Sequence, residues 1–349
     1  MSIDDTPILR GGLLALAAAI AFGVTIPLVD VLGKGSDALP IATLLYLGAA
    51  IVSVPGSRRT DREAPIRRAH VVRIVAVAGL GAFVAPFLLV WGLQRTTAAN
   101  ASLLLNFETF FTVALGVLLY REHLGARVLA ALGCMAAGGV CLVIGGFDER
   151  ALSLLGAGAV VLATLAWSFD NALTRPLADL DPTAVVLWKS AVGAAFGLTA
   201  SIATAGRFPA LARSLGLLAC GALGYGVSLR LYLGAQRRMG AARTASVFAT
   251  APFLGFIVAI AAGRGHASPG ALAAAVLFAV GIQVHLTERH AHAHSHAALE
   301  HEHAHRHDDG HHEHLHAEKV VGTHSHVHRH EPKTHRHPHA DDIHHRHTH

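Results

Sequence analysis

Several charged and amide side chains interrupt the long apolar stretches of this chain. Glu108 follows Asn106 and Asn100 within one such stretch. An ionisable group inside an apolar helix is costly, so it needs either a partner or a function. A carboxyl in these surroundings can carry a proton or meet a cation. The alternative is a structural carboxyl held by neighbouring amide or hydroxyl groups.

Asp170 and Lys189 lie in two consecutive apolar stretches, each close to the connection between them. We therefore expect antiparallel packing to bring the two charges together. A desolvated pair is expensive to break, so it could serve as an inner gate, or it could be a static link between two helices. Arg230 lies near the end of another apolar stretch, where it either contacts a substrate or extends its charged end toward water.

Histidine is concentrated in residues 288–349, which hold 23 of the 27 histidines of the chain. Imidazoles in alternating HxH runs can ligate Zn, Ni, Co or Cu(II), although the fold requires no cofactor. The alternative is a solvated tail whose charge rises below about pH 6.5. Apolar residues are sparse here, which predicts a disordered segment. The candidate ligands are His290, His292, His294, His296, His301, His303, His305, His307, His311, His312, His314, His316, His324, His326, His328 and His330.

The rest of the chain identifies the class of protein. Apolar residues make up 52% of the sequence and charged residues 15%, and the apolar residues occur in blocks of roughly 20, enough to cross a bilayer as a helix. An open sheet would leave backbone groups unpaired in lipid. We therefore predict an all-α polytopic membrane protein, not a soluble globule. The ten predicted transmembrane helices span 8–29, 38–55, 71–93, 98–119, 126–146, 152–173, 183–204, 214–235, 242–263 and 269–287.

Three prolines fall inside the predicted spans, namely Pro27, Pro86 and Pro252. Each removes a helical hydrogen bond and can open backbone carbonyls to a cavity, so each is a candidate hinge. Membrane helices also tolerate proline without any such role.

Positive charge in the connections predicts the orientation. One set of loops is rich in arginine, which by the positive-inside rule sets both termini in the cytoplasm of a multi-pass inner (plasma) membrane protein. The basic residues therefore report topology and do not indicate nucleic-acid binding. The expected inner loops hold Arg58, Arg59, Arg62, Arg67, Arg68, Arg73, Arg121, Arg127, Arg175, Arg237, Arg238 and Arg243, and the outer loops hold Lys34, Arg95, Arg150, Arg207, Arg213 and Arg264.

The two halves of the apolar region resemble each other. GLQR at residues 92–95 matches GAQR at 234–237, and AS at 101–102 recurs at 245–246. Five spans in each half would make two homologous units enter the membrane in opposite directions, an arrangement that recurs in transporters. The alternative is a chance likeness between alanine-rich helices.

Residues 12 to 287 resemble the EamA family of ten-helix permeases in the drug/metabolite transporter superfamily. The resemblance implies a two-repeat permease with both termini inside. Glu122 matches an acidic residue of such repeats, but His266 stands at the equivalent second position, and Asp30 lies where relatives often carry lysine. The resemblance is carried by AFGVTIPL (21–28), LLYLG (44–48), LLLNFE (103–108), YREHLG (120–125), DNALTR (170–175), GYGVS (224–228) and GAARTASVFATAPF (240–253).

These features together predict a secondary active permease, an exporter of a small metabolite or toxic compound. An exporter of divalent Ni, Co or Zn is one alternative, and a membrane-anchored metal store or sensor is another. No P-loop and no convergent catalytic motif occurs in the spans, so we expect no enzyme. The expected partners are lipid, a small substrate and a divalent metal, and a homodimer is left open. The predicted divisions are an N-terminal segment 1–7, repeats 8–146 and 152–287, and the tail 288–349.

Overall fold

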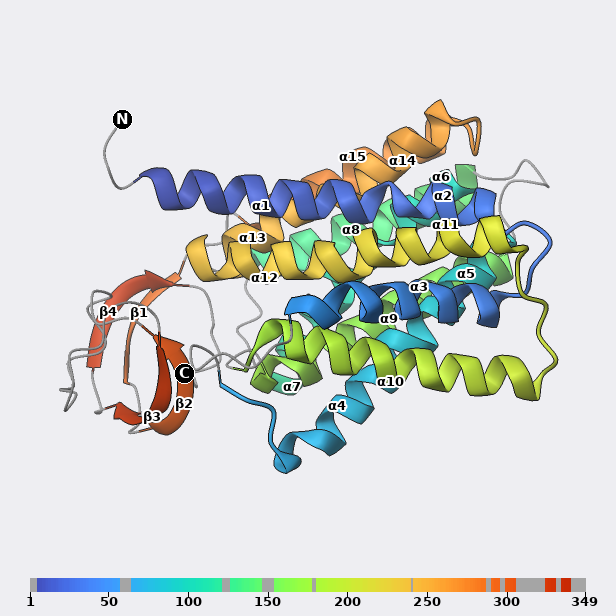
Figure 1. The fold of residues 1–349 in the computed structure, drawn as a ribbon. Coiled ribbons are helices and arrows are strands. Elements are labelled where there is room, and N and C mark those ends of the chain that lie inside the picture. The colour runs from blue at the N-terminus through green and yellow to red at the C-terminus, as the bar shows by residue number, and fades with distance from the viewer. Residues whose placement is uncertain are drawn as a thin grey trace.

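The described part of the chain is a bundle of helices followed by two pairs of short strands (Figure 1). Helices dominate because the apolar blocks must satisfy their backbone groups internally. The computed structural model describes residues 5–56, 64–120, 126–145, 154–177, 180–239 and 241–286, and the backbone of 290–295, 299–305, 324–330 and 334–339.

Each of the ten predicted ranges coincides with helix where the structure describes it. The first half contains α1 (Asp5–Gly23), α2 (Thr25–Leu32), α3 (Ala38–Ser53), η1 (Val54–Gly56), η2 (Arg68–His70), α4 (Val71–Val77), η3 (Ala78–Val84), α5 (Ala85–Leu93), α6 (Ala98–Leu104), α7 (Phe107–Tyr120) and α8 (Ala126–Gly145). The second half contains α9 (Leu154–Thr174), η4 (Arg175–Leu177), α10 (Pro182–Ala203), α11 (Leu211–Gly221), η5 (Ala222–Val227), α12 (Ser228–Met239), α13 (Ala241–Phe248), α14 (Ala251–Ala261) and α15 (Pro269–Leu286).

Six described helices are long and apolar enough to cross a membrane. Four further apolar helices, Ala38–Ser53, Ala126–Leu142, Ala251–Ala261 and Pro269–Val284, are shorter. Length and composition therefore support six of the ten predicted spans. The six long helices are Leu9–Leu32, Arg68–Leu93, Ala98–Leu115, Leu154–Thr174, Pro182–Ala203 and Leu211–Gln236.

Local irregularities divide several spans. The segments η3 and η5 are π-helices, and short breaks separate α6 from α7 and α13 from α14. Pro27, Pro86 and Pro252 each lie in the first turn of the helix that follows an interruption or a π-helix. Proline is tolerated there because the amide groups of a first turn have no acceptor within the helix. Whether the three sites move as hinges stays a prediction.

The irregularities recur at a fixed interval. The π-helices begin at Ala78 and Ala222, 144 residues apart. The helices α7 and α14, which follow the two breaks, begin at Phe107 and Ala251, again 144 apart, as do α3 and α10. The sequence motifs recur at nearly the same distances, 142 residues for GLQR and GAQR and 144 for AS, so the two halves share the positions of their breaks as well as short stretches of sequence.

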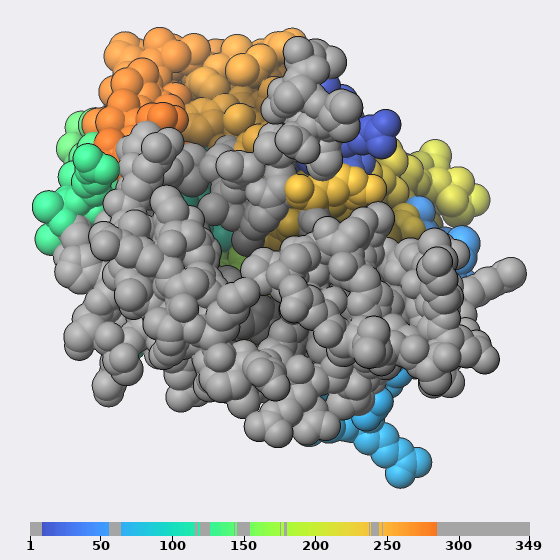
Figure 2. All heavy atoms as spheres, turned by 90° about the vertical axis from the view of Figure 1, so that its left-hand side faces the viewer, coloured from blue at the N-terminus to red at the C-terminus, as the bar shows by residue number. Residues whose placement is uncertain are grey.

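Four pairs of helices, each with one member from either half, form the core. The helix α3 packs against α10, and α8 packs against α15, while α1 packs against α12 and α5 against α9. Their contacts bury a large apolar cluster that includes Leu45, Leu89 and Phe278. Figure 1 shows that α1 begins at the end of the bundle beyond which the strands lie. Figure 2 views this end, where the start of α4, in light blue, projects away from the bundle.

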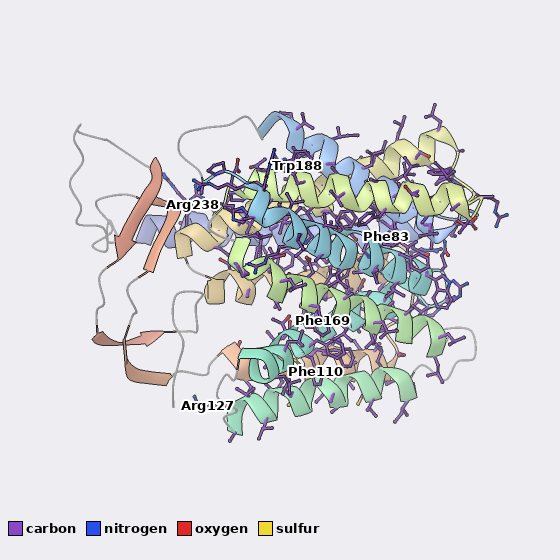
Figure 3. All side chains as sticks on the ribbon, turned by 90° about the horizontal axis from the view of Figure 1, so that it is seen from below. Phe83, Phe110, Arg127, Phe169, Trp188 and Arg238 are labelled. Atoms are coloured by element: carbon purple, nitrogen blue, oxygen red, sulfur yellow. The ribbon has the colours of Figure 1, made fainter. Side chains whose placement is uncertain are left out.

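The outward faces of the bundle are apolar. Exposed large side chains include Trp188 on α10 and Phe169 on α9, both labelled in Figure 3. Exposed apolar surface on a long helix is expected where lipid, and not water, is the solvent.

Four strands occur in the histidine-rich tail, where the sequence predicted no regular structure. β1 (His290–Ser295) pairs antiparallel with β4 (Thr334–His339), and β2 (Leu299–His305) pairs with β3 (His324–His330). The prediction therefore differs from the structure in these ranges. Alternation of histidine with a second residue has the period of a strand, a pattern that a reading based on composition overlooks. The registers set His292 opposite His337 and His303 opposite His326.

We predict that glycines at one crossing set the distance between α3 and α11. A Cβ atom on Gly221 would lie 1.8 Å from the carbonyl oxygen of Leu45, and one on Gly48 would lie 2.0 Å from that of Leu218. Gly221→Ala should therefore lower the unfolding free energy by roughly 1–3 kcal/mol because two backbones must separate. The shift in thermal midpoint in detergent measures this change.

Gly158→Ala is the matched control, since a Cβ atom at this α9 position meets nothing within 4 Å. Alanine is the better helix former, so this variant should be neutral or slightly stabilised. Equal midpoints for the Gly221 and Gly158 variants would contradict the tight crossing.

Candidate functional site

Glu108 lies in the first turn of α7, directly after the break that follows α6. Its Oε1 accepts a hydrogen bond from Nδ2 of Asn171 on α9 at 2.9 Å. The hydroxyl of Ser168, one turn earlier on α9, donates to the backbone oxygen of Glu108 at 3.0 Å. Glu108 is half-buried and Asn171 is exposed. The carboxyl is thus held by a neutral partner and keeps accessible surface.

Asp170 and Lys189 form the ion pair that the antiparallel arrangement of their helices predicted. The Asp170 carboxylate is 2% exposed and also accepts a hydrogen bond from Thr174 at 3.3 Å. Lys189 is likewise buried. Burial of both partners makes each dependent on the other, because an uncompensated charge inside the bundle is strongly destabilising. A gating role for the pair stays a prediction.

The π-helix η3 brings a backbone carbonyl to the same place. The oxygen of Gly81 accepts hydrogen bonds from the hydroxyl of Tyr46 at 2.6 Å and from Nε1 of Trp167 at 2.9 Å. A Cβ atom on Gly81 would lie 2.1 Å from Oδ2 of Asp170. Glycine at this position therefore lets the carboxylate approach the π-helix.

Six aromatic rings adjoin these polar groups, and we call them the aromatic cluster. Phe22 contacts the rings of Trp167 and Tyr225 edge-on, with centroids 6.3 and 5.6 Å apart. Tyr46 lies 5.2 Å from Tyr225. Electrostatic interactions link Glu108 to members of this cluster. The cluster consists of Phe22, Tyr46, Trp167, Tyr225, Tyr232 and Phe248.

Two buried polar atoms lack a hydrogen-bond partner among the described residues, Oδ1 of Asn106 and the hydroxyl of Tyr225. Asn106 is 2% exposed and Tyr225 is 7% exposed. The Nδ2 atom of Asn106 donates to the backbone oxygen of Leu103 at 2.9 Å. Buried polar groups are nearly always satisfied in native proteins, so each unpaired atom calls for an explanation such as a ligand.

The other predicted site residues are arranged differently. Asn100 is buried in the first turn of α6, where its backbone amide is bonded to the Thr97 hydroxyl, away from the break that precedes Glu108. Arg230 is half-buried on α12, and no described hydrogen bond or ion pair joins it to Glu108. The structure thus groups Asn106 and Glu108, and it pairs Asp170 with Lys189.

No group of three metal-ligating side chains occurs among the residues searched, which are the described ones. The tail is described only in the backbone of its strands, so it leaves the predicted metal ligands untested. Glu122 also lies outside the described residues. The predicted ligands His296, His307, His311, His312, His314 and His316 are outside them as well.

At the opposite end of the bundle, polar contacts connect segments of the first half with segments of the second. Asp30, where relatives often carry lysine, pairs with Arg264 just after α14. Asp37, the N-cap residue of α3, accepts from the backbone amide of Arg207 at 2.7 Å and pairs with its guanidinium at 3.5 Å. The backbone hydrogen bond, followed by the charge of Arg207, lowers the pKa of the exposed Asp37 carboxyl. The first half is thereby linked to the second at this end.

A comparison with protein families now assigns the first half. Residues 9–144 match the EamA-like transporter family. This part of the chain is similar to that family. The resemblance drawn from the sequence motifs is thereby confirmed, and six apolar helices agree with an integral multi-pass membrane protein.

The EamA-like chain is similar to a curated protein from Methanothermobacter thermautotrophicus that is named an uncharacterized transporter. The two are 30% identical over 183 residues, covering 48% of this chain and 53% of the relative. The chain therefore spans about half the length of the curated relative it matches. A solved crystal structure is similar with a TM-score of 0.59 and 18% identity, covering 79% of this chain and 95% of the other. At that identity the likeness concerns the fold alone.

Sequence reasoning missed several residues of this EamA-like site. Asn171 directly follows Asp170 in the DNALTR motif. The presence of Asp170 in an apolar span was therefore a signal that a second polar side chain lies in the same part of the helix. Tyr46 and Trp167 carry polar groups in apolar spans, a signal for a buried hydrogen bond. Gly81 gave no such signal, because its role depends on a carboxylate 89 residues away in the sequence.

We predict a strong coupling between Asp170 and Lys189. Lys189→Met should lower stability by about 3–5 kcal/mol because it leaves the buried carboxylate unpaired. Asp170→Asn combined with Lys189→Met should recover part of this loss. The measurement is a double-mutant cycle on thermal or denaturant unfolding of the purified protein in detergent.

Removing the exposed pair of Asp37 and Arg207 is the control, and little change is expected because water screens these charges. Additive losses from Asp170→Asn and Lys189→Met would contradict a mutually dependent pair.

Proposed function

We propose that this EamA-like protein is a secondary active permease that exports a small metabolite or toxic compound by alternating access. The observation that carries the proposal is Glu108, a half-buried carboxyl inside the bundle whose side-chain partner among the described residues is the neutral amide of Asn171. Intramembrane carboxyls of this kind are typical of proton relays and substrate sites. The match of residues 9–144 to the EamA-like transporter family supports the same class of function.

The inverted arrangement of two five-helix repeats is part of this proposal. Matching breaks 144 residues apart support it, because chance similarity between alanine-rich helices would not reproduce π-helices at equivalent positions. Reciprocal packing supports it further, since α1 contacts α12 while their counterparts α9 and α5 contact each other. In such transporters the substrate site lies between the repeats. The four shorter apolar helices would then complete ten spans with both termini in the cytoplasm.

Glu108 and Asp170 would have different tasks in this mechanism. Asp170 already has a cation, Lys189, so its charge is compensated in the present conformation. Glu108 has only the amide of Asn171, which can be released without uncovering an opposite charge. We therefore assign proton coupling to Glu108 and a structural or gating task to the Asp170–Lys189 pair. Around Glu108 the charged groups are Asp170 and Lys189, and the titratable phenols are Tyr46 and Tyr232.

The first functional prediction concerns Glu108→Gln. Glutamine keeps the hydrogen-bonding shape but cannot exchange a proton, so gradient-driven accumulation should be lost while downhill exchange persists. Proteoliposomes with an internal pH dye and an imposed pH gradient measure proton entry when each compound of a metabolite panel is added.

Asp37→Asn makes the same chemical change at an exposed position outside the site and should leave proton entry unaltered. If flux and its pH dependence survive in Glu108→Gln, Glu108 is not the coupling site.

The histidine tail is proposed to bind divalent metal. Support comes from the HxH runs and from the strand registers, which set histidine opposite histidine at alternate positions. A cytosolic tail of this kind could collect metal for export or store it. A third possibility is that it adjusts transport of another cargo.

We predict that the full chain binds several Ni²⁺ or Zn²⁺ ions and that a chain ending at Glu288 loses nearly all of them. Calorimetry of the two purified proteins measures this difference. Growth of cells carrying each form, or neither, under graded metal stress then separates the alternatives, because equal sensitivity in all three removes the metal exporter.

A further inference from the structure

The charges at the centre of the bundle do not balance. Lys189 pairs with Asp170, and Glu108 is hydrogen-bonded to the neutral Asn171. No ion pair among the described residues joins Glu108 to a cation, so Lys189 is paired with only one of the two carboxyl groups. A second cation would complete the site, since a carboxylate in a low-dielectric interior favours a positive partner.

Arg230 does not supply this cation. Tyr232, two residues further along α12, packs edge-on against Phe248 within the aromatic cluster, with ring centroids 5.0 Å apart. Residues two positions apart in a helix point in nearly opposite directions, so Arg230 faces away from this contact. The described hydrogen bonds and ion pairs agree, because none joins Arg230 to Glu108.

The hydrogen bonds at the centre leave acceptors unused. Tyr46 and Trp167 both donate to the oxygen of Gly81. Asn106 donates to a backbone oxygen, yet its Oδ1, which can only accept, has no partner among the described residues. The hydroxyl of Tyr225 is also unpaired there. The Oδ1 of Asn106 therefore requires a ligand that donates a hydrogen bond, and the hydroxyl of Tyr225 can accept one from the same ligand.

The aromatic cluster supplies the rest of the surroundings. Phe22 touches Trp167 and Tyr225, and Tyr46 touches Tyr225. Aromatic faces attract cations and cover apolar groups, with tryptophan the strongest of the side chains. The cluster therefore suits a ligand with a cationic head and an apolar or aromatic body.

We propose that the cargo of this site is a protonated primary or secondary amine with an apolar body, an inference that rests on the transport function above. The ammonium group supplies the charge that Glu108 lacks and the N–H donors that Asn106 and Tyr225 lack. A quaternary ammonium supplies the charge without donors. An anion would be repelled by the carboxylates of Glu108 and Asp170.

The test measures binding to the full chain in detergent, independently of transport. The probes are 2-phenylethylamine, its N,N,N-trimethyl analogue and its neutral N-acetyl derivative. Calorimetry should give an affinity for the amine at least roughly tenfold higher than for either analogue, since only the amine carries both charge and donors.

Two variants assign the effect to the site. Glu108→Gln should weaken binding of the amine by about tenfold or more. Tyr225→Phe removes one hydroxyl and keeps the ring, so it should weaken binding of the amine and leave that of the trimethyl analogue unchanged. This second variant also serves if Glu108→Gln fails to fold. Asp37→Asn, which changes an exposed carboxylate elsewhere, should alter neither affinity.

Equal affinity for all three probes, or equal losses for amine and trimethyl analogue in Tyr225→Phe, would overturn the amine site. The outcome is separable from the transport proposal. Proton-coupled flux of another compound without amine binding removes only the amine inference, whereas amine binding without flux of any compound removes only the permease.

Discussion

A buried carboxylate at Asp170 is the constraint on which the centre of this bundle depends. Its charge requires Lys189 on the next helix, and its remaining oxygen is bonded by Thr174 on its own helix. Its position also forbids a side chain at residue 81, because any Cβ atom there would overlap the carboxylate. One charge thereby fixes the distance between α9 and α10 and selects glycine in η3.

The consequences continue into the neighbouring helices. The oxygen of Gly81 is reached by Tyr46 from α3 and by Trp167 from α9. Two side-chain donors at one carbonyl tie α3, η3 and α9 together, and these polar ends orient the two rings toward Phe22 and Tyr225. The aromatic surroundings of the centre therefore follow from backbone geometry, which itself follows from the position of one carboxylate.

The positions of the helices could be predicted from the sequence more completely than the contacts of the candidate functional site. Lipid obliges apolar blocks to be helical, so block positions alone located the helices, and antiparallel order alone paired Asp170 with Lys189. The π-helices, the partnership of Glu108 with Asn171 and the role of Gly81 depend on contacts between distant segments, which local sequence does not specify. The break that leaves α14 with 11 residues was not predicted either, and the tail strands follow a pairing of distant segments that composition does not reveal.

The 144-residue correspondence explains why a regular scaffold holds an irregular site. At this interval Gly81 in the first half corresponds to Tyr225 in the second, Asn106 corresponds to Thr250, and Glu108 corresponds to Pro252. The first half thus contributes a carbonyl bonded by two side chains and a carboxyl where the second contributes a phenol and a proline. The fixed ion pair keeps α9 and α10 in contact, while Glu108 holds only a neutral amide across α7 and α9. A cation arriving at Glu108 can displace that amide without exposing any buried charge, so the loading step disturbs the contact between α7 and α9 and leaves the Asp170–Lys189 contact intact.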